Sequence, residues 1–404
     1  MRATHRTLAV LALALALVLA MAAPATALAL QTVYLDFDSE TGAGEWTYSG
    51  PERGAVHGAL ESLFAPLGVT VTTSVPGSVD YSTLFFNADA IGTSTGVDWR
   101  NVAFIDDAYV NAGLGLDFVG APLSGENIVK ASVNLGAHEV LHLLGARHHD
   151  AFTPIGTGVS SPGNKTKFDP VFPGPDGAAL SGLELNSLTT VLGFSADKLL
   201  SMDSFIGPRA ALKIRFAAHG ARGTEDGGSM LEAPEAITVS TYPVINTLPG
   251  ALEDDPPAPP FEAMVGAMKG EISDGEGDYY SFGGEAGRIV TIEVMSESLG
   301  HRLVEGDLAV ALLDESGTLI PYHGDFAFND DGFEGVDPLL LDIELPYTGT
   351  YIVEVFGAPP GTPVEYELLV YSLTEPAPVP LPAPLGLLAA GGALLAMRRR
   401  RGDA

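Results

Sequence analysis

The stretch HEVLHLLGARH, residues 138–148, places three histidines, a glutamate and a glycine at fixed spacings. It closes a segment from about Glu126 to Leu144 that has helical apolar spacing and no strong turn signal. His138 and His142 lie four residues apart and so project from the same face of the predicted helix. Gly145 stands where a helix C-cap is expected. The stretch therefore predicts a helix with two imidazoles on one face, followed by a glycine turn.

These residue types at this spacing indicate metal chemistry. Two imidazoles four residues apart can hold one zinc ion, and the turn at Gly145 lets His148 arrive as a third ligand. Three protein ligands leave a fourth position open for water, which is typical of catalytic zinc sites. Glu139, next to the first ligand, is the candidate general base for that water. The alternative is a helix whose histidines face solvent or the core, but five matching positions with only 9 His in 404 residues make chance improbable.

The stretch resembles the H-E-x-x-H-x-x-G-x-x-H signature of the metzincin metallopeptidases. The resemblance implies a catalytic domain with a mixed sheet and a zinc-site helix, peptide-bond hydrolysis, and a methionine turn beneath the metal. Met202, in LSMDS (residues 200–204), is the candidate for that turn. Several metzincin families carry a tyrosine two residues after the methionine, whereas this chain has Ser204. The family within the clan and the second electrophilic group are therefore left open.

Residues 30–220 are expected to form this α+β domain. Strands are predicted at Thr32–Phe37, Val69–Val75, Leu84–Phe86, Val102–Ile105 and Leu114–Val119, and helices near 55–64, 126–144 and 208–217. The resemblance implies that an extended substrate adds to an edge strand, for which Leu114–Val119 is the candidate. His149 and Asp150 follow the third ligand, where either a hydrogen bond to a ligand or simple exposure would fit.

The remainder of the chain has a different pattern. Residues 221–260 are rich in Gly, Glu, Asp and Pro and are predicted to be an acidic, Pro-rich linker. Residues 261–373 contain short strands separated by Gly and Asp turns, which predicts an all-β sandwich. In GDYYSF (277–282) and TGTY (348–351) this segment resembles the bacterial pre-peptidase C-terminal domain. That resemblance implies a role in substrate or surface binding, or a removable extension.

Carboxylates in the predicted loops of the sandwich are candidate calcium ligands, because calcium prefers oxygen donors. They are Asp278, Asp330, Asp331 and Asp337. Acidic turn residues facing water would give the same sequence pattern, so both interpretations remain open. Zinc is thus the predicted cofactor, with calcium as a further candidate.

Composition excludes several classes of function. The formal net charge is -31, from 51 acidic and 20 basic residues, and such a surface repels nucleic-acid phosphates. The chain has no cysteine, which rules out disulfides, thiolate ligands and a cysteine switch. Any metal must therefore be held by imidazole or oxygen donors.

Both ends of the chain are predicted to be targeting segments. Residues 1–29 have a basic start, an apolar run and small-x-small cleavage sites, as in a secretory signal peptide. Residues 374–404 contain VPLPA (379–383), an apolar run and the arginines 398–401. This end resembles the VPLPA/PEP-type C-terminal sorting signals of Gram-negative bacteria, which implies processing by inner-membrane sorting machinery. A plain C-terminal membrane anchor is the alternative.

These observations predict an exported zinc-dependent endopeptidase, displayed at the cell surface or released, that hydrolyses protein or peptide substrates with Glu139 as general base. Two alternatives belong to other classes. One is a non-catalytic zinc-binding surface or matrix protein, and the other is a zinc hydrolase that acts on cell-wall material.

Overall fold

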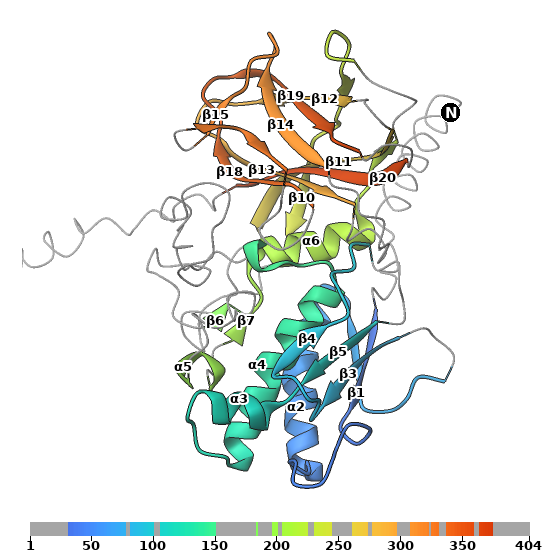
Figure 1. The fold of residues 1–404 in the computed structure, drawn as a ribbon, viewed down its shortest axis with the longest axis vertical. Coiled ribbons are helices and arrows are strands. Elements are labelled where there is room, and N and C mark those ends of the chain that lie inside the picture. Colours follow the sequence, from blue (N-terminus) through green and yellow to red (C-terminus); the bar gives the residue numbers. More distant parts are fainter. Residues whose placement is uncertain are drawn as a thin grey trace, which may run out of the picture.

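The structure is a computed structural model, and it describes an N-terminal α/β unit joined to a β-sandwich (Figure 1). The described residues are 31–77, 81–100, 106–150, 183–184, 196–200, 204–224, 230–244, 261–273, 277–296, 308–322, 325–330, 337–358 and 363–374. The fold is therefore mixed α/β in its first unit and all-β in its second. The predicted targeting segments at the two ends lie outside the described residues.

The N-terminal unit is built on a five-stranded sheet. In spatial order its strands are β2 (Thr70–Thr72), β1 (Thr32–Asp36), β3 (Ser82–Phe86), β5 (Asp107–Val110) and β4 (Gly92–Ser94). All neighbouring pairs are parallel except the last, in which β4 runs antiparallel to β5 at the edge of the sheet. The sheet thus ends in one antiparallel strand, and no strand among the described residues pairs with its outer edge. Such an edge can accept another extended chain.

Two helices pack against this sheet and against each other, namely α2 (Gly50–Phe64) and α4 (Gly125–Leu143) (Figure 1). A 3-10 turn, η1 (Ala65–Leu67), follows α2. The α4 helix begins at the N-cap Ser124, whose side chain accepts a hydrogen bond from the backbone of Asn127. From Leu135 to Leu143 every residue of α4 is buried, so the helix runs through the core of the unit and not along its surface.

One predicted strand of this unit is wrong. Residues 114–119 belong to helix α3 (Ala112–Phe118), because the Asn111 side chain accepts a hydrogen bond from the backbone of Leu114 and caps a helical turn. Gly115 lets α3 pack closely against α4, since a Cβ at this position would lie 3.3 Å from a methyl carbon of Leu135 in α4. The edge strand is β4 instead. The predicted strand Val102–Ile105 lies outside the described residues.

The sandwich consists of two mainly antiparallel sheets with their own apolar core, and among its described residues only the short strands β8 and β9 pair in parallel. In the first sheet the order is β10 (Ser240–Val244), β11 (Phe261–Ile272), β20 (Val364–Thr374), β13 (Ile289–Met295) and β18 (Leu339–Glu344), with β8 (Gly223–Thr224) also on β11. In the second the order is β17 (Phe328–Asn329), β14 (Ala309–Asp314), β19 (Gly349–Phe356), β12 (Gly277–Gly284) and β9 (Glu235–Ala236). Short pieces complete the fold: α5 (Ala196–Leu199), and the pairs β6 (Leu183–Glu184) with β7 (Ser204–Phe205) and β15 (Pro321–Tyr322) with β16 (Asp325–Phe326).

The predicted linker over residues 221–260 is partly wrong. Strands β8 and β10 pair with β11, and β9 pairs with β12, so this segment contributes strands to both sheets of the sandwich. The Gly, Glu and Asp content suggested a linker, but the pairing partners of these strands supply the hydrogen bonds that hold them extended. Residues 245–260 lie outside the described part.

The two units share a continuous apolar core. The cluster that holds the buried side chains of α4 also contains Leu369 and Tyr371 from β20. Helix α6 (Pro208–His219) lies between the units in Figure 1, and its Ala211 and Ile214 belong to the same cluster. The sandwich is therefore packed onto the N-terminal unit, which argues against a freely removable extension. Within the described ranges, no helix is at once long enough and apolar enough to cross a bilayer.

Candidate metal centre

The end of α4 directs the chain towards the candidate ligands. The Gly145 N–H donates to the His142 carbonyl at 2.9 Å, and the Ala146 N–H donates to the Leu141 carbonyl at 3.0 Å. This is the Schellman arrangement, in which the residue after the cap adopts a left-handed conformation. Gly145 does so with φ of 88°, and a Cβ there would lie 3.2 Å from the backbone of Asp98. A glycine is thus required for the chain to reverse towards His148.

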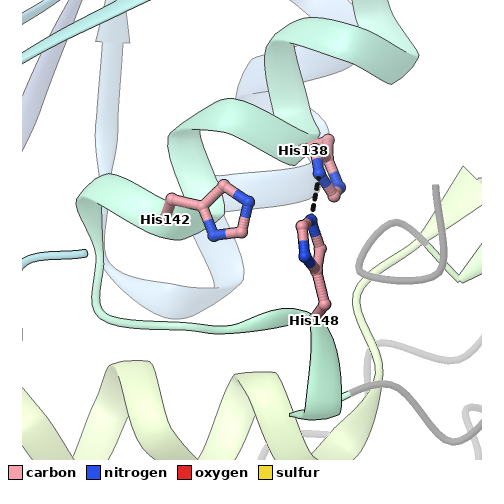
Figure 2. A group of neighbouring side chains, drawn as sticks. All are labelled: His138, His142 and His148. Atoms are coloured by element: carbon pink, nitrogen blue, oxygen red, sulfur yellow. Dashed lines mark hydrogen bonds between the residues drawn. The ribbon is translucent and has the colours of Figure 1, made fainter. Parts of the chain in front are cut away.

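The three predicted histidine ligands come together at one point (Figure 2). One ligand atom from each of His138, His142 and His148 lies within 4.8 Å of the others. The Nε2 atoms of His138 and His148 are 2.9 Å apart, and the three ring centroids are separated by 4.7, 4.8 and 4.9 Å. His138 and His142 come from the last turns of α4, and His148 begins the 3-10 turn η2 (His148–Asp150). The structure thus contains a group of three histidines that can bind a metal ion.

The protonation and tautomers of these histidines fit a metal site. The Ala146 carbonyl accepts a hydrogen bond from Nδ1 of His142 at 2.9 Å, which leaves Nε2 with a free lone pair. Burial lowers the pKa of His142, and burial together with the neighbouring histidines lowers the pKa of His148. Neutral imidazole is the form that binds metals. Two nitrogens on one tetrahedral zinc would lie about 3.3 Å apart, close to the separation of His138 and His148.

Glu139 follows the first candidate ligand, His138, in α4, and its side chain lies against the edge strand β4. Its side chain is buried, and a Cβ on Gly92 of β4 would come within 2.5 Å of its Oε1 atom. Burial raises the pKa of Glu139 to about 8. A carboxyl group with a pKa near neutrality can both accept and release a proton under ordinary conditions. The arrangement thus combines three imidazole donors with a buried carboxyl group, next to a strand whose outer edge pairs with no strand among the described residues.

The structure describes only some of the other residues predicted for the N-terminal site. Met202 lies outside the described residues, so the predicted methionine turn stays a prediction. Ser204 begins the short strand β7.

The four candidate calcium ligands have different environments. Asp278 lies in strand β12 and not in a loop as predicted; it is buried and accepts a hydrogen bond from the Tyr366 hydroxyl at 2.5 Å. Asp337 is also buried, with partners described below. Asp330 is exposed, and Asp331 lies outside the described residues. Within the described ranges, none of these aspartates belongs to a group of three potential metal ligands. Calcium binding therefore stays a prediction from composition.

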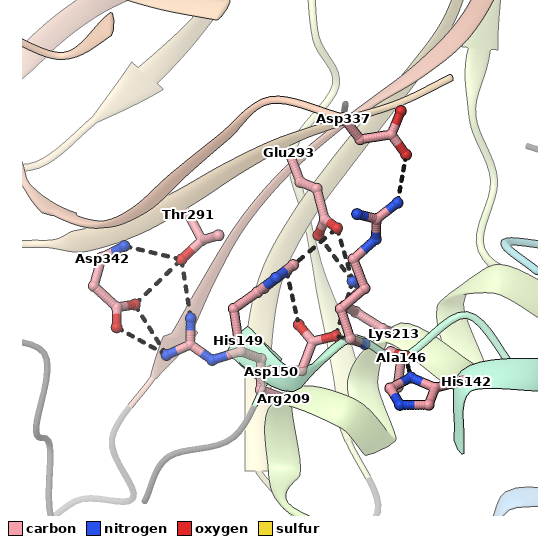
Figure 3. Close-up of polar contacts among 11 residues, drawn as sticks. His142, Ala146, His149, Asp150, Arg209, Lys213, Thr291, Glu293, Asp337 and Asp342 are labelled. Atoms are coloured by element: carbon pink, nitrogen blue, oxygen red, sulfur yellow. Dashed lines mark hydrogen bonds and ion pairs between the residues drawn. The ribbon is translucent and has the colours of Figure 1, made fainter. Parts of the chain in front are cut away.

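Sequence reasoning missed a buried polar network that flanks His148 (Figure 3). His149 and Asp150 are buried; they contact charged residues distant in the sequence and are not exposed. Lys213 of α6 and Glu293 of β13 complete this network. Lys213 and Glu293 lie 80 residues apart, and both are distant in the sequence from His149 and Asp150, so no local spacing could reveal the network. The only signal in the sequence was the pair of charged residues, Arg147 and Asp150, on either side of a predicted ligand.

Comparison with known proteins gives partial likenesses of fold. No family model and no curated protein matches this chain. A structure of Aeromonas hydrophila PliG, a periplasmic lysozyme inhibitor of g-type lysozyme, is 16% identical, with a TM-score of 0.19 over 27% of this chain and 86% of that one. The pre-peptidase C-terminal domain of collagenase from Bacillus anthracis is 20% identical, with a TM-score of 0.19 over 26% and 86%. Salmonella Typhimurium PliG is 13% identical, with a TM-score of 0.17 over 27% and 91%.

Proposed function

We propose that this protein is a zinc-dependent endopeptidase of metzincin type. The observation that carries the proposal is the convergence of His138, His142 and His148 beside a buried glutamate. A group of three neutral imidazoles is the donor set typical of catalytic zinc, because it leaves one coordination position open. When bound, zinc supplies a Lewis acid that polarises a carbonyl oxygen and makes water more acidic.

In this proposal the chain's own residues handle protons and orient the substrate. Glu139 takes a proton from the attacking water and delivers it to the leaving amine. The outer edge of β4, which pairs with no strand in the described part of the chain, binds an extended peptide and so places it near Glu139, where Gly92 leaves room for the carboxylate. An extended peptide is the kind of substrate that a strand edge recognises, which favours peptide over carbohydrate substrates.

We further propose that the protein works outside the cytoplasm. The support is the sequence of the ends, residues 1–29 and 374–404, with their signal-peptide and VPLPA-type patterns. A net charge of -31 suits a soluble protein in that setting. The sandwich, similar in sequence pattern to pre-peptidase C-terminal domains, is proposed as an accessory domain. Calcium binding through its acidic loops is a subsidiary proposal.

The test is cleavage of casein and of a peptide library by the purified protein. Glu139→Gln should lower kcat by at least about a thousandfold, because it removes the general base, while the zinc content stays near one ion per chain. A chelator should abolish activity and added zinc should restore it. Cleavage by the Gln variant at the wild-type rate would refute the assignment. Zinc binding without any cleavage would favour a binding protein, and release of peptidoglycan fragments alone would favour a cell-wall hydrolase.

A further inference from the structure

The third histidine lies in a segment held on both sides by the β-sandwich. On one side, the Arg147 guanidinium donates to Asp337 Oδ2 at 2.7 Å, and Asp337 also accepts from the backbone and hydroxyl of Ser296 at 2.7 Å. Arg147 immediately precedes His148, while Asp337 and Ser296 flank strands β18 and β13 of the sandwich. The pair is almost completely buried, with 4% and 1% of the two side chains exposed.

On the other side of His148, the contacts run through Lys213. Its Nζ lies 2.9 Å from Asp150 Oδ2 and 2.9 Å from both carboxylate oxygens of Glu293. His149 Nε2 lies 3.3 Å from Glu293 Oε1. Asp150 Oδ2 also accepts the Arg147 N–H at 2.8 Å, which closes the turn around His148. Figure 3 shows these side chains converging from η2, α6 and the sandwich.

This cluster is a set of ion pairs and not a second metal centre. His149, Asp150 and Glu293 have ligand atoms close enough to hold an ion, but the Lys213 ammonium already lies between the two carboxylates. Burial alone would raise the pKa of Glu293, yet Lys213 and His149 hold it well below its ordinary value. Glu293 is therefore charged, and the Lys213 side chain of the chain itself lies against both carboxyl groups. Breaking such a buried pair is costly because it leaves an unpaired charge.

The geometry points to Glu293 and Asp337 as positioning residues for His148. Glu293 fixes the segment after this ligand, through Lys213 and His149, and Asp337 fixes Arg147 before it. The sandwich is then a structural part of the metal centre. The other two ligands need no such support, because α4 itself holds them at fixed spacing. This inference rests on the metal-binding part of the proposed function and not on peptide hydrolysis.

Zinc affinity, measured by competition with a chromophoric chelator, tests the inference together with the visible absorption spectrum of the cobalt-substituted protein. Asp337→Asn and Glu293→Gln in the full chain should each weaken zinc binding by about tenfold to a hundredfold, the range typical of residues that orient metal ligands. The cobalt spectrum should also change in intensity, because it reports the ligand geometry at the metal. A residue needed only for stability would leave that spectrum unaltered in the folded protein.

Asp342→Asn is the matched control. Asp342 forms another ion pair across the same interface, at 2.9 Å from Arg209, but it contacts no residue of the 147–150 turn. This variant should lower the melting temperature while zinc affinity stays within about twofold of wild type. Should a single variant fail to fold, Arg147→Met combined with Asp337→Asn removes the charge pair and keeps the acceptor for Ser296. That double variant should fold and still bind zinc weakly.

The outcomes separate two kinds of failure. Wild-type affinity and an unaltered cobalt spectrum in folded Asp337→Asn and Glu293→Gln would overturn the positioning role while leaving the metal site intact. Equal weakening in Asp342→Asn would also overturn it, since the effect would then follow general interface stability. A wild-type protein that binds no zinc would instead refute the proposed function itself.

Discussion

At the residue scale, the site depends on what burial does to a few ionisable groups. Burial lowers the pKa of His142 and of His148, and it raises the pKa of Glu139 to about 8 in the metal-free protein, because a buried charge is disfavoured. A cluster prepared in this way accepts a cation without first having to expel protons from its imidazoles. The sequence predicted the three histidines and Glu139 because their spacing along one helix is local information. It could not predict the buried pair of Lys213 and Glu293, whose partners meet only through tertiary packing.

The raised pKa of Glu139 predicts that the wild type and Glu139→Gln differ in stability by an amount that depends on pH. The pKa rises from an ordinary 4.5 to about 8 on folding, so the folded state favours the protonated form. The contribution of this group is fully present below about pH 4.5 and is lost as the pH rises through 8. The free energy of unfolding of metal-free Glu139→Gln should therefore equal that of the wild type near pH 4.5. At pH 8.5 it should exceed the wild-type value by an amount on the order of a few kcal/mol.

Urea unfolding of the chelator-treated proteins at the two pH values measures this difference. Glu61→Gln, at an exposed position of α2, is the matched control, and its difference in unfolding free energy from the wild type should be the same at both pH values. An advantage of Glu139→Gln that is the same at both pH values would contradict the burial of an ionisable carboxyl group.

At the scale of elements, the important fact is that β4 and not residues 114–119 forms the edge of the sheet. The prediction failed because Leu114, Leu116 and Phe118 have the alternating apolar pattern of a strand. The side chain of Asn111 instead caps and stabilises a helix. Strands β1 and β3 and helices α4 and α6 were predicted close to their observed bounds, since each carries a long apolar pattern. β4 has only three residues, GTS, and no apolar pattern to reveal it.

Gly92 of β4 gives a test of that edge. A methyl group there would meet the Glu139 carboxylate at 2.5 Å, so Gly92→Ala must displace this flexible side chain. We expect kcat/KM for peptide cleavage to fall by about tenfold to a hundredfold, because a small misplacement of a catalytic group is costly. Zinc affinity should be unchanged. Thr93→Ala, the next position on the same strand, is the control, and equal losses in both variants would count against the contact.

At the scale of the whole molecule, four ion pairs between the two units each join a basic residue of the N-terminal unit to an acidic residue of the sandwich. The N-terminal unit supplies Arg100, Arg147, Arg209 and Lys213, and the sandwich supplies their partners Glu367, Asp337, Asp342 and Glu293. Four of the 20 basic residues of a strongly acidic chain are thus committed to one buried surface. Their partners lie up to 267 residues away in the sequence, which explains why composition suggested a linker and a separable domain.

This interface predicts that the N-terminal unit does not fold alone. A fragment of residues 31–220 would lack the sandwich partners Asp337, Asp342 and Glu293 of its residues Arg147, Arg209 and Lys213. Each broken pair costs about 3–5 kcal/mol, against a total stability of about 5–15 kcal/mol. Circular dichroism and urea titration should show no cooperative transition for the fragment, whereas residues 31–374 should unfold cooperatively. A cooperatively folded fragment that binds zinc as tightly as the longer chain would contradict both this expectation and the shared core.

The position of strand β20 in the sequence also determines when folding can be completed during synthesis. It lies between β11 and β13 in the sheet, and its Leu369 and Tyr371 enter the core shared with α6, yet it is among the last described segments that a ribosome would make. While the chain is growing, α4 can present its two histidines, but the surface that holds the turn around His148 does not yet exist. The order of synthesis therefore delays the assembly of the three-histidine site until β20 has been made.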